Sequence, residues 1–176
     1  MDIAVLRREI AADEGCRTEL YNDHLGLLTC GIGHLLTPAD AEYGQPIGTP
    51  ITMDRVNELF AQDMDTAIED CQSIIDGFDE LPQEARHILI NMAFNLGRTR
   101  LAKFKKMIAA IEAGDWNEAA NQMHDSKWRQ QVSARAGRLI RRMRDLAISV
   151  PALPVNISFA RCWRMSALRR HRRLMV

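Results

Sequence analysis

Apolar residues recur at helical spacing over the first fourteen residues of the chain. They form one stripe, at positions i, i+3 and i+7, which consists of Ile3, Leu6 and Ile10. Gly15 follows, and a glycine at this place commonly ends a helix. The pattern therefore predicts a helix over residues 3–14. Glu14 lies four residues after Ile10 and continues the stripe, so its side chain should face the interior or the wall of a cleft.

The pattern changes over residues 18–36, where glycines interrupt short apolar runs. Together with the turn signal Asn22-Asp23, this punctuation is typical of a small antiparallel sheet. Residues 37–51 contain three prolines and predict a loop.

A long amphipathic helix is predicted over residues 53–75, with Thr52 as its N-cap. Its apolar stripe includes one acid, Asp63, which lies four residues after Leu59. A helix of this length, placed between a small sheet and a helical remainder, can join two lobes.

From Pro82 onward the pattern is helical throughout, and Pro82 suits a first helical turn. Residues 88–96 are apolar on nearly all sides, which indicates a helix at the centre of its lobe. Asp115 and Glu118 resemble a capping box, and Ser133 could cap a further helix.

These elements predict an α+β fold that is mostly helical, with two lobes and a small antiparallel sheet in the first. The expected parts are an N-terminal lobe over 1–52, an interlobe helix over 53–75, a helical C-terminal lobe over 76–150 and a basic tail over 151–176. With 176 residues, 47% of them hydrophobic and 26% charged, the chain has the composition of a soluble globular protein. No apolar run approaches the roughly 20 residues that span a bilayer.

The net charge of zero hides an asymmetry between body and tail. Residues 1–145 carry all 23 acids and 17 of the 23 Lys and Arg, a net of −6, whereas residues 146–176 carry six arginines and no acid. Three interpretations of the tail remain open: a segment without a role, a cationic segment that binds lipopolysaccharide or an anionic membrane, or a nucleic-acid contact. We expect no nucleic acid as a partner, and the sequence leaves the order of the tail open.

Metal and export signals do not stand out. The four cysteines and five histidines form no C-x-x-C, H-E-x-x-H or similar ligand spacing, so we predict no metal and no cofactor. The first residues carry acids and no apolar core of a signal peptide. We therefore expect a protein that stays in the cytoplasm or leaves it by another route.

Candidate chemistry gathers in residues 13–34. A carboxyl on an apolar stripe, such as Glu14, loses hydration, and the helix C-terminus adds partial negative charge; both effects favour the protonated form. Asp23, in a polar turn, should stay ionised. One protonated and one ionised carboxyl form the acid/base pair of many glycosidases, and the hydroxyl of Thr29 could help to hold the attacking water.

Several ordered motifs resemble the phage-type lysozymes, the endolysin family of muramidases. These motifs are D-E-G-x-R-x-x-x-Y-x-D (Asp13–Asp23), L-T-x-G-I-G-H (Leu28–His34), T-x-D-x-V-N-E-L-F-x-Q-D (Thr52–Asp63), I-N-M-A-F-N-L-G (Ile90–Gly97), W-x-E-A-A (Trp116–Ala120) and S-K-W…S-A-R-A-x-R (Ser126–Arg138). The resemblance covers roughly residues 3–144 and does not extend into the arginine-rich end.

The resemblance implies hydrolysis of the β-1,4 bond between N-acetylmuramic acid and N-acetylglucosamine in peptidoglycan. It implies that Glu14 protonates the leaving oxygen and that Asp23 and Thr29 place a water on the opposite face of the sugar, with inversion of the anomeric centre. The partner would be a peptidoglycan glycan strand and the enzyme a monomer. It would accumulate in the cytoplasm of a bacterial host and reach the wall through a membrane lesion.

Supporting residues follow from the same motifs. We interpret His34 as a structural histidine paired with Asp63, because a buried carboxylate needs a partner. Arg135 is expected near Glu14, where its charge would oppose the effect of burial.

Three further residues match cleft positions and are expected to contact sugar: Leu35, Phe94 and Asn95. Phe94 fits a plain core position equally well. Two other functions stay open: a lytic transglycosylase, and a non-catalytic binder of cell wall or membrane that works through the basic tail.

Overall fold

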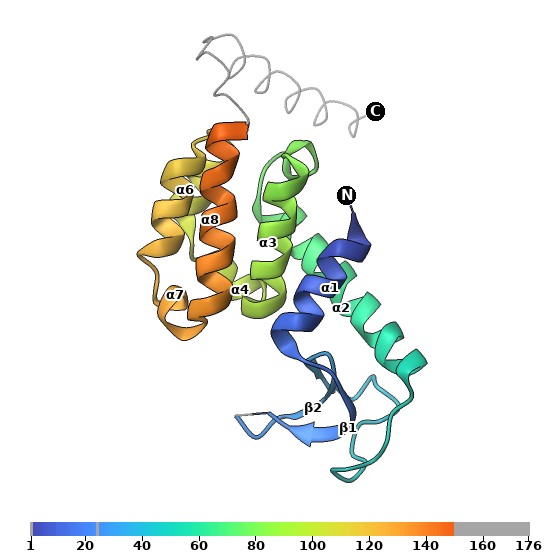
Figure 1. Cartoon of the computed structure of the whole chain (residues 1–176). Coiled ribbons are helices and arrows are strands. Elements are labelled where there is room, and N and C mark those ends of the chain that lie inside the picture. Colours follow the sequence, from blue (N-terminus) through green and yellow to red (C-terminus); the bar gives the residue numbers. More distant parts are fainter. Residues whose placement is uncertain (1, 24, 150–176) are drawn as a thin grey trace, which may run out of the picture.

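The computed structural model describes residues 2–23 and 25–149, so the predicted basic tail over 151–176 lies outside the described residues (Figure 1). Helix α1 spans Ile3–Glu14, as predicted. The side chain of Asp2 accepts a hydrogen bond from the amide of Val5 and caps its start. Gly15 ends it with φ of 76°, and its amide donates to the carbonyl of Ala11.

The predicted small sheet is present and antiparallel. Its strands are β1 (Arg17–Asn22), β2 (Leu28–Gly31) and β3 (His34–Leu35), in the order β1-β2-β3. Thr29 lies opposite Tyr21 on one side and opposite Leu35 on the other, and Cys30 pairs with His34. A bulge interrupts the β1–β2 register between Arg17 and Tyr21.

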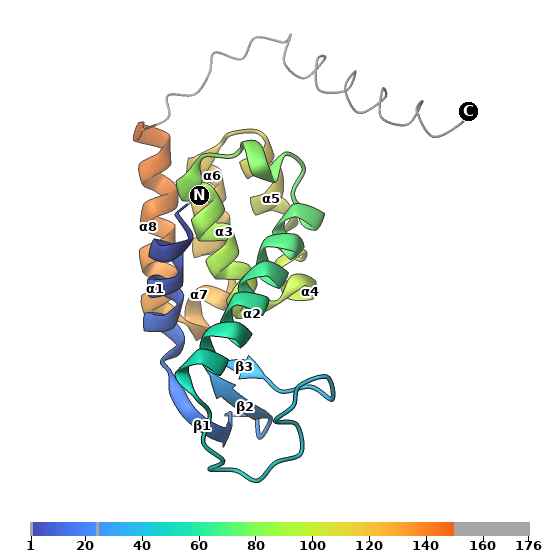
Figure 2. The same ribbon diagram turned by 90° about the vertical axis from the view of Figure 1, so that its right-hand side faces the viewer.

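Helix α2 (Met53–Ile74) leads from the sheet to the helical part of the molecule, as Figure 2 shows. Thr52 caps its start by accepting a hydrogen bond from the amide of Arg55 at 3.2 Å, as expected. The helix ends one residue earlier than predicted, where Ile75 has extended backbone. Its buried side consists of Val56, Leu59, Phe60, Met64, Ala67 and Cys71.

Short connections join the remaining helices. These remaining helical elements are the 3-10 turn η1 (Phe78–Glu80) and helices α3 (Gln83–Leu96), α4 (Arg98–Leu101), α5 (Lys105–Glu112), α6 (Trp116–His124), α7 (Lys127–Gln131) and α8 (Ser133–Ser149). The predicted cap at Asp115 is present, because its side chain accepts from the amide of Glu118. Pro82 precedes α3 instead of lying in its first turn, and Ser133 is the first residue of α8 instead of its cap.

Helix α3 lies at the centre of the core, as its apolar pattern predicted, and is buried from Ala85 to Ala93 apart from Arg86. Helix α1 precedes the sheet in the chain, yet its side chains contact the helices. Arg7 hydrogen-bonds Asn57 of α2, and Glu9 pairs with Arg142 of α8. None of the helices in the described ranges has both the length and the apolarity to cross a bilayer.

Candidate active site

Glu14 is the last residue of α1, and an arginine holds its carboxylate. Nη2 of Arg135 donates to Oε1 of Glu14 at 2.8 Å. Arg135 comes from α8 and is 6% exposed, so the contact predicted between these two residues is present and largely shielded from water. The side chain of Glu14 is one-quarter exposed, which leaves part of it open to a ligand.

Arg135 also binds the neighbouring acid, which the sequence reasoning missed. Its Nε lies 3.1 Å from Oδ2 of Asp13, and Asp13 accepts further hydrogen bonds from Arg138 and from the buried amide of Asn91. Burial alone would raise the pKa of Asp13, but the bond from Arg138 and the charge of Arg135 outweigh it and lower that pKa. An ionised Asp13 thus fixes the guanidinium that holds Glu14.

Asp23 follows strand β1 and organises the turn to β2. Its Oδ1 accepts hydrogen bonds from the amides of Leu25 and Leu27, both at 2.8 Å, and its own amide donates to the carbonyl of Leu27. Two amide donors on one oxygen are the partners of an ionised carboxylate, and they set its orientation.

Thr29 is the second residue of β2, beside this turn, and is buried. Its hydroxyl donates to the carbonyl of Leu27 at 2.9 Å, so its oxygen is left as an acceptor. Tyr21 lies directly opposite Thr29, and the charges of Glu14 and Asp23 both affect its pKa. Burial raises the pKa of Tyr21, the charge of Arg17 lowers it, and the charges of Cys30, Glu14 and Asp23 raise it further.

Gly33, between β2 and β3, lies against the acid. A Cβ atom at Gly33 would stand 3.6 Å from Oε2 of Glu14, and the residue has φ of +75°. The missing side chain therefore leaves space beside the carboxylate oxygen that Arg135 does not bind. The hairpin and the end of α1 thus bring Glu14, Asp23 and Thr29 around the same small sheet.

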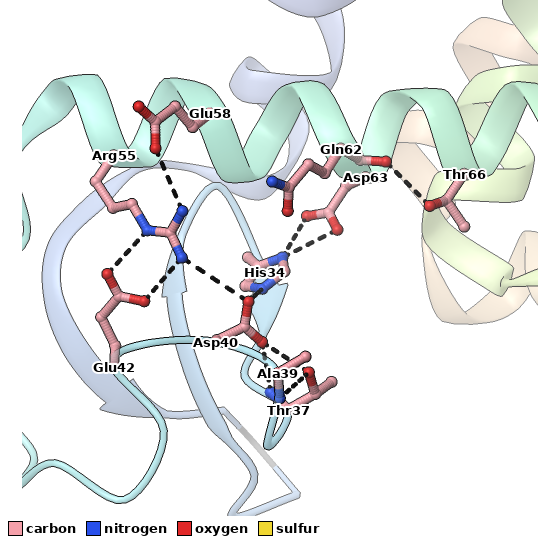
Figure 3. A network of polar contacts seen from close by, with 10 residues as sticks. All are labelled: His34, Thr37, Ala39, Asp40, Glu42, Arg55, Glu58, Gln62, Asp63 and Thr66. Atoms are coloured by element: carbon pink, nitrogen blue, oxygen red, sulfur yellow. Dashed lines mark hydrogen bonds and ion pairs between the residues drawn. The ribbon is translucent and has the colours of Figure 1, made fainter.

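His34 pairs with Asp63, as predicted. Its Nδ1 lies 2.9 Å from both carboxylate oxygens of Asp63, and its Nε2 lies 3.4 Å from Asp40, an ion-pair contact that the sequence reasoning missed (Figure 3). The hydrogen bond with Asp63 raises the pKa of His34; burial opposes it, and the negative charges of Asp63 and Asp40 add to it. The histidine thus ties β3 to α2 and to the loop that carries Asp40.

The same loop is held a second time by Arg55 of α2. Its guanidinium donates to both carboxylate oxygens of Glu42, at 2.9 and 3.1 Å, and also contacts Glu58 (Figure 3). Asp40 in turn accepts from the amide and the hydroxyl of Thr37. This network fixes the loop between the sheet and α2, and so ties β3 and this loop to α2.

The three predicted sugar contacts differ in their surroundings. Leu35 is about half exposed on β3, opposite Thr29, and is available to a ligand. Phe94 packs against Phe60 with ring centroids 5.5 Å apart and joins the core, which favours its packing role. Asn95 accepts a hydrogen bond from the indole of Trp128 at 2.8 Å, which fixes its amide at the end of α3.

Two signals in the sequence could have revealed the missed partners. Asp13 directly precedes Glu14, so both acids end the same helix. Asn91 is the one asparagine of α3 that is fully buried, and a buried amide needs a partner. Asp40 and Arg55 carry no such signal, because their positions depend on how the loop folds.

A carboxyl held by a buried arginine, together with a hairpin that carries an aspartate and a threonine, has the groups expected of a hydrolase site of the acid/base class. The family model of phage lysozyme matches residues 11–145. The chain belongs to the phage lysozyme family and is a lytic hydrolase.

Individual relatives agree with this assignment. "Probable T4-type lysozyme 1" of Dictyostelium discoideum is 31% identical over 157 residues, which span 78% of this chain and 92% of that protein. "Pre-baseplate central spike protein Gp5" of Enterobacteria phage T4 is 34% identical over 145 residues, 72% of this chain and 25% of that protein. "Peptidoglycan hydrolase gp36" of Pseudomonas phage phiKMV is 31% identical over 144 residues, 81% of this chain and 15% of that protein.

Proposed function

We propose that this chain is an endolysin that hydrolyses the β-1,4 bond between N-acetylmuramic acid and N-acetylglucosamine in bacterial peptidoglycan. The observation that carries the proposal is the arginine-held carboxyl of Glu14 beside the hairpin with Asp23 and Thr29. Family membership and a relative named as a peptidoglycan hydrolase support the substrate. The glycan strand would lie across the sheet and the ends of α1 and α3.

On the leaving-group side of the bond, Glu14 donates a proton to the oxygen of the leaving sugar. Arg135 donates to Oε1, so the proton is carried on Oε2, the oxygen beside Gly33. The absence of a side chain at Gly33 lets the glycosidic oxygen approach this position. Asp13 keeps Arg135 in place, so the acid does not rotate away during bond cleavage.

In the same step, a water attacks the anomeric carbon from the opposite face and the bond to the leaving oxygen breaks. The hydroxyl of Thr29 donates a hydrogen bond to the carbonyl of Leu27. Its oxygen is therefore free to accept a hydrogen bond from the water. Asp23, oriented by two amides, takes the other proton as general base. The product then has the inverted configuration, because no covalent bond to the enzyme forms.

A glutamate substitution tests the proposal. We expect Glu14→Gln to lose wall-solubilising activity by at least about a hundredfold on purified peptidoglycan, because the amide has no proton to donate. Glu69→Gln is the matched control, since Glu69 is exposed on α2, outside the proposed path of the glycan strand, and the same charge is removed. Clearing of a wall suspension at the wild-type rate by Glu14→Gln would show that Glu14 is not the catalytic acid and would overturn the proposed mechanism.

Product analysis distinguishes the enzyme classes. The proposed hydrolase yields reducing sugars, whose anomeric configuration NMR detects early in the digest; the α-anomer from the β-linked substrate indicates inversion. A lytic transglycosylase would instead release 1,6-anhydro sugars without consuming water. Mass spectrometry of the soluble fragments separates these two products by the mass of one water.

We further propose that the protein acts from the bacterial cytoplasm on the periplasmic wall once a membrane lesion releases it. The basic tail over 151–176 is proposed to contact lipopolysaccharide or anionic membrane. Removal of the tail should then reduce lysis of intact Gram-negative cells and leave the digestion of purified walls unchanged. Equal activity of both proteins on intact cells would assign the tail no role there.

A further inference from the structure

A strongly cationic segment lies on helices α4 and α5, outside the site. Residues 85–111 contain no acid, and residues 98–106 (RTRLAKFKK) carry five cations in nine positions. The cations are Arg98, Arg100, Lys103, Lys105 and Lys106, here called the 98–106 patch. Figure 2 shows α4 and α5 on the other side of the helical body from α1 and α8. Helices α1 and α8 carry Glu14 and its partner Arg135.

All five cations are exposed, and none of them has a carboxylate partner within residues 2–23 and 25–149. Elsewhere in the fold, arginines with structural roles are paired: Arg55 with Glu42, Arg135 with Glu14, and Arg142 with Glu9. The patch therefore keeps its positive charge uncompensated by the protein itself.

The patch also opposes the stability of its own helix. Lys105 and Lys106 are the first two residues of α5, at the end of the helix where its dipole is positive and cations are unfavourable. Phe104 precedes them and supplies no side-chain cap. An anion bound here would relieve this repulsion, so the arrangement suits a ligand better than it suits the free helix.

The two ends of the patch meet in a hollow. Arg98 and Lys105, seven residues apart, line the same depression of about 410 Å³. Ser73, Ile74 and Ile108 contribute to its wall. Glu112 lines it too, and one of its carboxylate oxygens accepts from the amide of Asp76. None of the residues of the proposed active site lines this hollow, so a ligand here leaves that site open.

We propose that the 98–106 patch docks on an anionic phospholipid surface, with a headgroup phosphate in the hollow between Arg98 and Lys105. The segment exposes no large apolar side chain, so the contact is electrostatic and peripheral, without insertion. A nucleic acid fits less well, because single-strand binders stack bases on exposed aromatic rings, whereas Phe104 is half-buried against Trp128. The proposal does not depend on hydrolysis.

The test uses vesicle co-sedimentation of the full chain and, beside it, of a form without the basic tail over 151–176, so that binding by the tail does not mask binding by the patch. Wild type should bind vesicles that contain phosphatidylglycerol and lose binding as salt rises; vesicles of phosphatidylcholine alone should bind little. Replacing Lys103, Lys105 and Lys106 together by glutamine should weaken binding by about fivefold for each cation, roughly a hundredfold in all. Circular dichroism and thermal melting confirm that the variant is folded.

A matched variant separates the patch from net charge. Arg8, Lys127 and Arg141 are exposed on α1, α7 and α8, and their triple replacement by glutamine removes the same charge. We expect this control to retain binding within a few-fold of wild type. The proposal is overturned by equal losses in both triple variants, by equal binding to phosphatidylcholine, or by a duplex DNA that displaces the protein from the anionic vesicles at equal phosphate concentration.

Discussion

Removing the negative charge of Asp63 should destabilise the protein in a pH-dependent way. In the folded chain, Nδ1 of His34 lies 2.9 Å from both oxygens of Asp63, and His34 is 9% exposed. Asp63→Asn keeps the shape of the side chain but replaces the carboxylate by a neutral amide. We expect the pKa of His34 to fall toward its ordinary value, because the hydrogen bond with Asp63 is the largest cause of its rise.

The magnitude follows from the geometry of the pair. A hydrogen bond to a charged group contributes about 1.5–3 kcal/mol to the free energy of unfolding. The carboxylate of Asp63 is partly open to water, and Asp40 still faces Nε2 of His34 at 3.4 Å in the variant. Both facts reduce the loss, so we expect about 1–2 kcal/mol near pH 6, or roughly 2–8 °C in melting temperature.

The sign of the pH dependence is fixed by the raised pKa of His34. The stabilisation is present in full below the ordinary histidine pKa of about 6.5 and is lost as the pH rises through the folded-state value. The gap between wild type and Asp63→Asn should therefore narrow in alkaline solution.

Urea unfolding followed by tryptophan fluorescence across the pH range measures this gap, and NMR follows the titration of His34 directly. Asp65→Asn, an exposed acid two positions along α2, is the matched control and should change neither quantity. The reasoning is refuted if His34 titrates identically in wild type and Asp63→Asn, or if the stability gap stays constant with pH.

Two further substitutions probe the acid and its support. Gly33→Ala should lower the free energy of unfolding by about 1–2 kcal/mol, because Gly33 has φ of +75°, and it should also slow wall hydrolysis, since the new Cβ stands beside Glu14. Gly48→Ala, at a similar φ but in open surroundings, is the control for the backbone effect alone. Retained hydrolysis by the Gly33 variant would contradict this account. Asp13→Asn should lower the free energy of unfolding by about 2–3 kcal/mol at neutral pH, measured by urea unfolding, because the substitution leaves Arg138 unpaired. Because the pKa of Asp13 is lowered in the folded protein, this difference from wild type is present above the ordinary pKa of about 3.9 and disappears as the pH falls through the folded-state value. A stability difference that stays undiminished in acid would count against this prediction.

Local signals in the sequence were sufficient for much of the fold. The helix over residues 3–14, the cap at Thr52 and the cap at Asp115 depend on neighbours within a few positions, and all three are present. The helix starts near Pro82 and Ser133 differ by a single residue, because the backbone of a cap and that of a first turn are similar.

Contacts between distant residues were predictable only where a motif or an unpaired buried group announced them. The ion pairs of His34 with Asp63 and of Arg135 with Glu14 fall in this class. The contacts of Asp13 with Arg138 and of Asp40 with His34 do not, because they depend on the docking of α8 and on the path of a loop. The catalytic roles of Glu14 and its partners rest on the family resemblance, since a glutamate at a helix end is common.

The ion pairs between α1 and α8 join the first helix to the last helix that the structure describes. Glu9 pairs with Arg142, Asp13 with Arg138 and Glu14 with Arg135, so the acid acquires its partner only after the ribosome has made the last of these helices. A nascent or prematurely terminated chain that lacks residue 135 has no arginine to hold the carboxyl. If Glu14 is the acid proposed above, we expect chains that end before residue 135 to hydrolyse peptidoglycan poorly, so that activity would depend on the completion of this helix.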